Sequence, residues 1–296
     1  MFKNIFSNLY GIGQVLFKAT PLIFAGLGVA IAFKGGIFNI GGEGQIYMGA
    51  LLTAITGIYL KLPAYILLPL SIIAGFIGGG IWGLIPGYFK AKYNAHEVIT
   101  TIMLNFIAIA ITNYLTSGII NVPETVRTKE VSCFIPRIED FFPQFKGSAL
   151  NLSFFIAILL VIYFTYYLYR TKSGFELRVL GESIDCAEYS GVNIKKKIIS
   201  TMFLSGGLCG LVGINFVLGY KHYFEQGFSG GAGFMAIAVA LLGNNTPFGV
   251  FFASLLFGIL SFGGLIINAY VPKELVDILQ AVIILSVISF REVFKR

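Results

Sequence analysis

The sequence predicts an all-α fold, a polytopic bundle of transmembrane helices in one domain over residues 1–296. Of the 296 residues, 56% are hydrophobic and only 12% are charged, whereas soluble domains carry about 25% charged residues. The mean hydropathy is +0.84. In addition, apolar runs recur along the whole chain, several of them near the length of about 20 residues that crosses a bilayer. Together these features indicate an integral membrane protein.

Nine apolar segments are predicted to lie in the membrane, separated by polar or glycine-containing breaks. In chain order they are 20–33, 45–60, 64–87, 97–119, 151–169, 197–219, 232–243, 247–267 and 275–290. Three of them, 20–33, 45–60 and 232–243, would reach only about 21, 24 and 18 Å at about 1.5 Å per residue. These short segments are expected to be broken helices.

The distribution of basic residues predicts the orientation. If the 170–197 loop lies in the cytoplasm, alternation places the N-terminus outside, the C-terminus inside, and twelve of the twenty-one Lys and Arg residues inside. Cytoplasmic loops of membrane proteins carry such an excess. The 120–150 loop is then external, and its four basic and four acidic residues balance. The net charge of +7 therefore indicates topology and contact with anionic lipid, and no nucleic-acid partner is expected.

Two polar breaks stand out because each lies beside a short segment. "FKGGIFNIGGEGQ" (33–45) and "LLGNNTPFG" (241–249) each join apolar runs through glycine and amide residues. Paired interruptions of this kind point to the substrate region of transporters, although polar turns at the cytoplasmic surface would look the same. The polar candidates for a substrate path in these breaks are Asn39, Glu43, Gln45, Asn244 and Asn245. Glu43 has an alternative role, as a favourable charge at the start of the following helix.

A third set of polar residues lies within segment 97–119. Thr101, Asn105, Ile109 and Asn113 follow one another at four-residue spacing, which places them on one face of a helix. Amides on such a face either hydrogen-bond to neighbouring helices or face a solute. Asn105 therefore joins the path candidates.

The 170–197 loop is too polar to span the membrane. Ser183 could cap a short helix over 184–190 that ends at Gly191, since serine is a preferred N-cap and glycine a preferred left-handed stop. Ala187 and Tyr189 would then be available for a partner's groove. The alternative is a surface loop without a partner.

Motifs for catalysis on bound nucleotide or metal are absent from the sequence. It has no GxxxxGK[ST] and no HExxH, and Cys133, Cys186 and Cys209 are scattered without a CxxC pair. We therefore expect neither an enzyme nor a metal site.

Four stretches together resemble a known family: "ATPLIFAGLGVAIAFKGGIFNIGGEGQ", "HEVITTIMLNFIA", "LRVLGESIDCAEYSGVN" and "FMAIAVALLGNNTPFG". They are similar to the membrane permease subunits of ABC importers, in the superfamily of ribose and branched-chain amino acid permeases. The motifs FNIG-x-EGQ, HEV-x-x-TIMLN and IAVALLGNN-x-P-x-G resemble its nucleoside-uptake branch. Ribose permeases usually have a serine-bearing first break, and amino acid permeases a histidine-bearing one.

The resemblance implies transport of nucleosides or nucleobases, with Phe38 and Tyr47 as stacking faces for a base. A permease for ribose or another sugar is the alternative within the class. An ion-coupled secondary carrier is the alternative of another class, and it would need a buried carboxylate relay. Apart from Glu97, the first residue of segment 97–119, Asp277 is the only acidic residue inside the predicted segments.

The resemblance also implies a bacterial plasma-membrane complex with a second permease subunit, identical or different. Two cytoplasmic ATPase subunits, which hold ATP and Mg²⁺, and an external substrate-binding lipoprotein complete it; this chain itself is expected to bind no cofactor. Residues 182–191 correspond to the coupling helix that docks into the ATPase. The coupling residues implied in and before it are Arg178, Gly181, Glu182, Ala187, Tyr189 and Gly191. Members usually have a further helix ahead of the segment matching Leu9–Phe17, which gives ten spans.

Overall fold

The computed structural model describes residues 8–267 together with residues 275, 278, 282 and 286. Within these residues the regular structure is helical, with only isolated β-bridges between loops, so the all-α prediction is confirmed. The predicted segment 275–290 lies largely outside the described residues. The remaining eight predicted segments each overlap a helix or, for 197–219, two successive helices.

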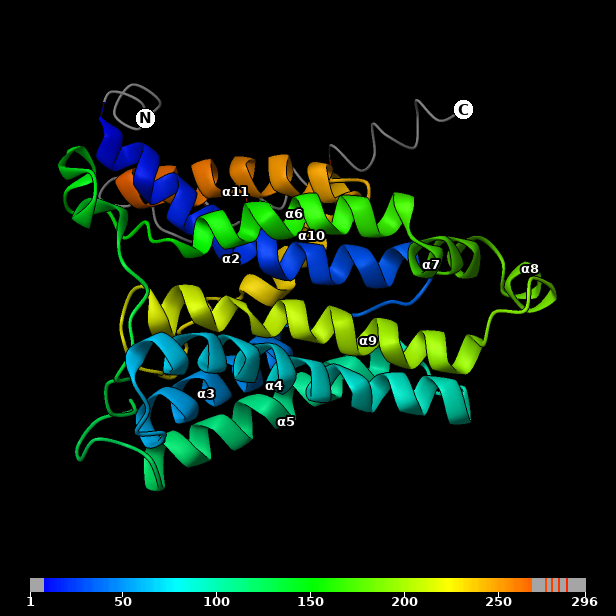
Figure 1. Ribbon diagram of the computed structural model, residues 1–296, viewed down its shortest axis with the longest axis horizontal. Helices are drawn as coiled ribbons and strands as arrows, with labels where there is room; N and C mark the ends of the chain where they lie inside the picture. Colours follow the sequence, from blue (N-terminus) through cyan, green and yellow to red (C-terminus); the bar gives the residue numbers. More distant parts are fainter. Residues whose placement is uncertain (1–7, 268–274, 276–277, 279–281, 283–285, 287–296) are drawn as a thin grey trace.

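The helices lie side by side along the long axis of the molecule (Figure 1). In chain order they are α2 (Leu9–Lys34), α3 (Gly42–Tyr59), α4 (Ala64–Tyr93), α5 (Glu97–Gly118), the short 3-10 turns η1 (Ile138–Asp140) and η2 (Pro143–Phe145), α6 (Ser153–Arg170), α7 (Lys172–Glu182), α8 (Ile184–Tyr189), α9 (Ile194–Gly210), the π-helix η3 (Ile214–Leu218), α10 (Ala232–Leu242) and α11 (Pro247–Ile267). In the described part, six helices are long and apolar enough to cross a membrane, with α9 and η3 counted as one.

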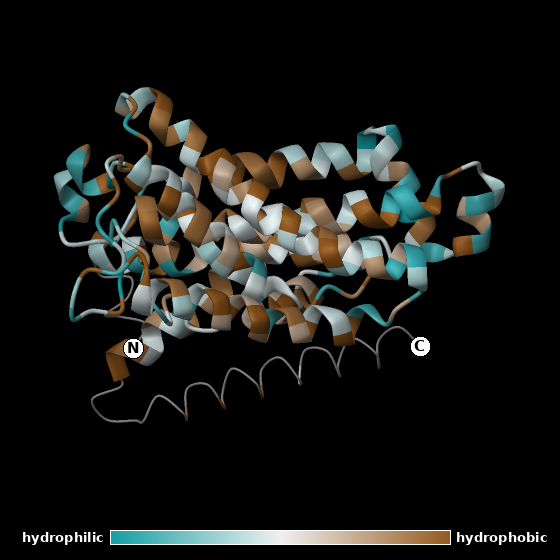
Figure 2. Cartoon of the chain, turned by 90° about the horizontal axis from the view of Figure 1, so that it is seen from below, coloured by the Kyte–Doolittle hydropathy of each residue, from teal (hydrophilic) through white to brown (hydrophobic). Residues whose placement is uncertain are grey.

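Hydrophilic residues gather at the two ends of this bundle, and the middle is largely hydrophobic (Figure 2). One end carries residues 120–150 and the start of α2, where the Gln14 side chain donates a hydrogen bond to the Gly147 carbonyl (3.4 Å). The other end carries α7 and α8. Large apolar side chains such as Phe106 and Leu159 are exposed between the ends, which suits a surface surrounded by lipid. We refer to the 120–150 end and the 170–197 end.

The first predicted segment is wrong in its start and its length. Segment 20–33 is the second half of α2, which begins at Leu9 and runs for 26 residues. Gln14 and Lys18 interrupt the apolar run, yet Gln14 reaches the 120–150 loop and Lys18 lies over the Phe17 ring. These polar residues therefore do not end the helix. Helix α7, within the 170–197 loop, was also not predicted.

A seam of glycines joins α4 to α9. A methyl group at Gly79 would lie 2.2 Å from the Gly206 carbonyl oxygen, and one at Gly210 would lie 2.3 Å from the Gly75 carbonyl oxygen. Glycines four residues apart allow this direct backbone contact between membrane helices. On α3, Gly49 meets Gly210 equally closely. Helices α3, α4 and α9 therefore form one tightly packed unit, which supports the site below.

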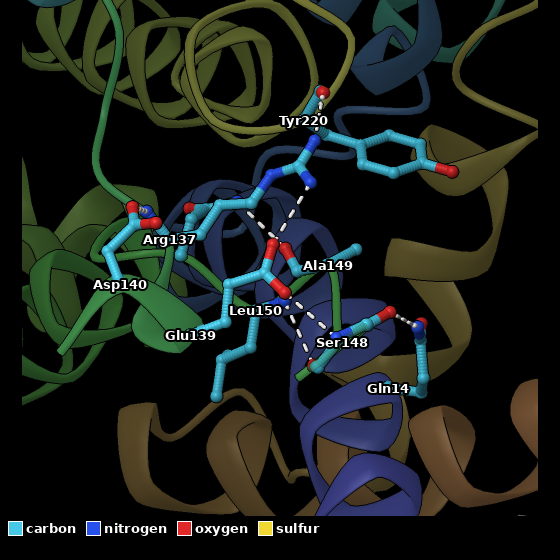
Figure 3. Close-up of polar contacts among 10 residues, drawn as sticks. Gln14, Arg137, Glu139, Asp140, Ser148, Ala149, Leu150 and Tyr220 are labelled. Carbon is cyan, nitrogen blue, oxygen red and sulfur yellow. Dashed lines mark hydrogen bonds and ion pairs between the residues drawn. The ribbon is translucent and has the colours of Figure 1, made fainter. Parts of the chain in front are cut away.

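The 120–150 loop is fastened across its end of the bundle by Arg137 (Figure 3). The Arg137 guanidinium donates to the Tyr220 carbonyl (2.9 Å) and to the Glu139 carboxylate (3.3 Å). Glu139 also accepts a hydrogen bond from the Gly147 amide (2.8 Å). The Gly147 amide and, to a smaller extent, Arg137 hold the pKa of Glu139 below its ordinary value. This loop thus holds the segment after η3, which leads to α10.

Candidate functional site

Two helices begin inside the bundle, and their first turns touch. Helix α3 follows the 35–41 connection from α2, and α10 follows the 219–231 connection from η3. A methyl group at Gly233, in the first turn of α10, would lie 2.2 Å from the Glu43 backbone nitrogen and 2.6 Å from the Gly42 carbonyl carbon. Helix starts leave backbone N–H groups without partners in the helix, so this meeting point needs acceptors.

Glu43 supplies those acceptors across the two helices. Its Oε2 accepts a hydrogen bond from the Gly233 amide (2.8 Å), and its Oε1 accepts one from the Ser229 hydroxyl. The side chain is only 4% exposed. The carboxylate lies in the first turn of α3 and caps α10, where the helix dipoles favour a negative charge. Residues 227–231 match the pattern G-x-S-x-G, yet Ser229 follows a loop rather than a strand and its hydroxyl bonds to a carboxylate.

Asn39 and Gln45 form a second set of contacts beside Glu43. Each amide donates to the other, from Asn39 Nδ2 to Gln45 Oε1 at 2.9 Å and from Gln45 Nε2 to Asn39 Oδ1 at 3.1 Å. Asn39 also donates to the Ser205 hydroxyl (2.7 Å), which donates to the Gly28 carbonyl (2.7 Å). All three side chains are buried. The pair therefore ties the break between α2 and α3 to both α2 and α9.

Asn105, on α5, hydrogen-bonds to the same break between α2 and α3. Its Oδ1 accepts from the Gly44 amide (2.8 Å), and its Nδ2 donates to the Ile40 carbonyl (2.9 Å). Non-helical backbone inside a membrane protein requires such partners. On the same helix Thr101 is buried, whereas Asn113 is partly exposed. In this structure Asn105 bonds to a neighbouring segment, which is the first of its two expected roles.

These side chains make up the central polar cluster, defined as Asn39, Glu43, Gln45, Asn105, Ser205 and Ser229. Aromatic rings pack around Tyr47, one turn along α3 from Glu43. Phe228 lies 5.1 Å from the Tyr47 ring, and Phe224 lies 6.2 Å from it. Phe216 of η3 packs on Phe228 at 5.6 Å. A compact aromatic group therefore lies beside the cluster, and the side chains of the cluster are buried in this structure.

Sequence reasoning missed Ser205, Ser229 and Gly233, and the contact that they make with the first break. The break that meets 33–45 is 229–233, "SGGAG", and not 241–249. Asn244 and Asn245 lie in the turn between α10 and α11 with left-handed φ of 55° and 51°. They follow the 11 residues of α10, about 16 Å of helix. The glycines around Ser229, directly before a short apolar segment, were the available signal.

Phe38 and Tyr47 occupy different environments. Phe38 is 53% exposed and packs against Phe33 at 5.1 Å, whereas Tyr47 is buried. Phe38 lies in the connection that touches Gly181 through Gly36. The two rings therefore do not form one stacking site in this structure.

The short helix predicted at 184–190 is confirmed as α8. The Ser183 hydroxyl accepts from the Cys186 amide (3.3 Å), and Gly191 has a φ of +75°. The expectation that Ala187 is available to a partner is wrong. Its side chain is fully buried in a cluster with Leu180 and Met202 of its own chain. Tyr189, in contrast, is 94% exposed.

The other coupling candidates connect α7 to the centre of the bundle. Arg178 lies over the rings of Tyr169 (5.4 Å) and Phe175 (5.9 Å). A methyl group at Gly181 would lie 2.1 Å from the Lys34 carbonyl oxygen, so the end of α7 abuts the end of α2. Glu182 is exposed. The 170–197 end is thus in direct contact with the connection that leads to Asn39.

Among the described residues, no group of three or more His, Cys, Asp and Glu side chains could hold a metal ion. The cluster offers amides, hydroxyls and one carboxylate. Such groups exchange hydrogen bonds with a polar solute.

Comparison with known proteins identifies the family of this chain. The family described as branched-chain amino acid transport system / permease component matches residues 11–288. The guanosine ABC transporter permease protein NupP of Bacillus subtilis is 39% identical over 298 residues, which cover 98% of this chain and 84% of NupP. No solved structure matches.

Two further relatives differ in their named cargo. A glucose ABC transporter permease protein of Haloferax volcanii is 33% identical, over 100% of this chain and 80% of its own length. The nucleoside ABC transporter permease protein NupB of Lactococcus lactis is 33% identical, over 96% and 80%. Second permease proteins of B. subtilis (NupQ) and L. lactis (NupC) match more weakly, at 26% and 29% identity.

Proposed function

Because the chain belongs to the family of branched-chain amino acid transport system permease components, and is thus a multi-pass plasma-membrane permease of an ABC transporter, we propose that it imports a nucleoside or a free nucleobase. The observation that carries this proposal is the similarity to NupP and NupB over nearly the whole chain. The family match removes the ion-coupled carrier from consideration.

We assign the path to the central polar cluster. Its amides and hydroxyls both donate and accept, which suits a neutral solute, and Glu43 adds two acceptor oxygens. Tyr47 and Phe38 offer aromatic faces at separate positions, and stacking on such faces is worth about 1–3 kcal/mol per base in nucleic-acid complexes. Asn244 and Asn245 would border the path at a second level, one short helix away from Glu43.

The partners follow from the same proposal. NupP and NupQ, like NupB and NupC, are two permease proteins of one organism, which supports a second permease subunit here. The 120–150 end would face outside, toward a substrate-binding lipoprotein. The 170–197 end would face the cytoplasm, where α8 would present Tyr189 to an ATPase subunit that binds ATP and Mg²⁺.

A sugar cargo is the second candidate, because the glucose permease of H. volcanii matches over the full chain. Radiolabelled guanosine and glucose, supplied separately to cells that express the complete transporter, separate the two. We expect guanosine uptake that stops when cellular ATP is depleted and continues when an uncoupler collapses the proton gradient under maintained ATP. Glucose uptake without guanosine uptake would show that the cargo is a sugar. Uptake that survives ATP depletion would contradict ABC import.

The same assay tests the path. Gln45→Leu removes both hydrogen bonds to Asn39 and should reduce the rate of guanosine uptake while the amount of inserted permease is unchanged. The matched control is Gln14→Leu, at the edge of the bundle, where the side chain's only hydrogen bond within the described part of the chain is a long one to Gly147. Equal uptake in the two variants would remove Gln45 from the path.

A further inference from the structure

The contact between Glu43 and the start of α10 connects parts of the bundle that are packed very differently. Glu43 belongs to α3, which is held to α9 by the close approach of Gly49 to Gly210. Its hydrogen-bond partners, Ser229 and Gly233, lie 186 and 190 residues away. The carboxylate therefore joins a rigid helix unit to the start of a short helix.

The segment before α10 has the properties of a hinge. Gly227, Gly230 and Gly231 have φ of +73°, +58° and +81°, and, apart from their chain neighbours, no atom of the described residues lies within 4 Å of the place where a Cβ would be. Glycine adopts these angles without strain, and the space beside each residue leaves room to turn. The seam glycines, in contrast, are in backbone contact. Ser229 is thus flanked by three glycines in left-handed conformations with open space beside them.

The aromatic group is attached to the same segment. Phe228 directly precedes Ser229 and packs on Tyr47 of α3 and on Phe216 of η3. Rotation about the flanking glycines would withdraw the Ser229 hydroxyl from Glu43 and the Phe228 ring from Tyr47 together. A polar contact and an apolar contact would therefore open in one movement.

On the basis of the proposed function, we propose that the contact of Glu43 with Ser229 and Gly233, here called the Glu43 latch, is a closed gate of the path and that residues 227–231 are its hinge. Closure satisfies Oε1 with the Ser229 hydroxyl of the hinge segment and Oε2 with the Gly233 amide just beyond it. Rotation of the hinge removes the hydroxyl and leaves one oxygen of a buried charge without a partner, which is unfavourable. Water or a donor group of the cargo must then replace the serine hydroxyl, so the gate stays shut when neither is present.

Cys209 is a native reporter of this gate. Its Sγ is buried and lies 3.7 Å from the place of a methyl group on Gly42, beside the latch. In the full-length permease with Cys133→Ala and Cys186→Ala, it is the sole remaining thiol. We expect slow modification of Cys209 by a membrane-impermeant maleimide added outside the cell. Ser229→Ala should speed it about tenfold, since one hydrogen bond to a charged group shifts a two-state equilibrium by roughly that factor.

Two variants keep the test decisive. Ser254→Ala is the matched control, because Ser254 is also buried and its hydroxyl has no hydrogen-bond partner among the described residues; it should label as slowly as the parent. Glu43→Gln should label faster than the parent, as Ser229→Ala does.

Unchanged labelling rates in both latch variants, with normal insertion, would overturn the proposed gate, as would equal acceleration by Ser254→Ala. If labelling changes but the parent carries no nucleoside, the latch stands and the proposed cargo fails. If the parent carries guanosine and labelling does not change, the latch alone fails.

Discussion

At the scale of single residues, Asn105 shows how one amide can hold a helix break together. It pairs with a carbonyl before α3 and with an amide in the first turn of α3, at 2.9 and 2.8 Å. Neither Ile40 nor Gly44 has a helical partner for that group, because both lie at the helix start. The side chain therefore replaces hydrogen bonds that the backbone cannot make for itself.

Asn105→Leu should accordingly destabilise the permease. It leaves two buried backbone groups unpaired, each at a cost of about 1–3 kcal/mol. The measurement is the thermal unfolding temperature of the purified protein in detergent. Asn113→Leu is the matched control on the same helix, since the Asn113 Oδ1 has no hydrogen-bond partner in the part of the chain that the structure describes, and its unfolding temperature should stay close to that of the parent. Similar losses in both variants would show that Asn105 acts only by its volume.

At the scale of elements, α8 is a short helix with one buried and one exposed side. Ser183 caps its start, Gly191 ends it, and Ala187 anchors it against residues of α7 and α9. A polar residue in place of Ala187 would disturb that anchor and could not report on docking. Tyr189 is the informative position, because its side chain is almost fully exposed.

Tyr189→Ala should weaken association with the ATPase and reduce uptake, while the unfolding temperature of the isolated permease stays unchanged. The measurement is co-purification of the ATPase with the variant beside the uptake assay. Tyr65→Ala, a change of another largely exposed tyrosine (78%) at the start of α4, should leave both unchanged. Normal co-purification and uptake with Tyr189→Ala would direct the search for the dock to residues 88–96.

At the scale of the whole molecule, the sequence was most informative where a helix is bounded by breakers. Segment 247–267 begins with α11, and 97–119 coincides with α5 to within one residue, because apolar runs bounded by Gly, Asn, Pro or His have clear ends. The start of α2 was missed because Gln14 and Lys18 resemble an end, and only the folded chain shows where these side chains go.

The central polar cluster could be predicted only in part. Asn39, Glu43, Gln45 and Asn105 are conspicuous as polar residues in apolar surroundings. Their partners are serines and a glycine, which are common in membrane helices and carry little signal. The meeting of Glu43 with Gly233 spans 190 residues. No local pattern specifies such a contact, so the break 241–249, with its two asparagines, was the more prominent choice.

The orientation of the whole molecule can be tested with its own cysteines. The excess of Lys and Arg, twelve of twenty-one, predicts that the 170–197 end lies in the cytoplasm, and Cys186 in α8 is exposed at that end. Cys133 and Cys209 are buried, and burial raises the pKa of the Cys133 thiol, so both should react slowly with a maleimide. A membrane-impermeant maleimide should therefore leave the permease unlabelled in intact cells and label it once the cells are opened. Cys186→Ser should abolish the labelling seen in opened cells.

Phe141→Cys, at an exposed position of the 120–150 end, should add labelling in intact cells, because that end would face outside. Rapid labelling of Cys186 in intact cells would reverse the orientation, and with it the sides assigned to the ATPase and the binding protein.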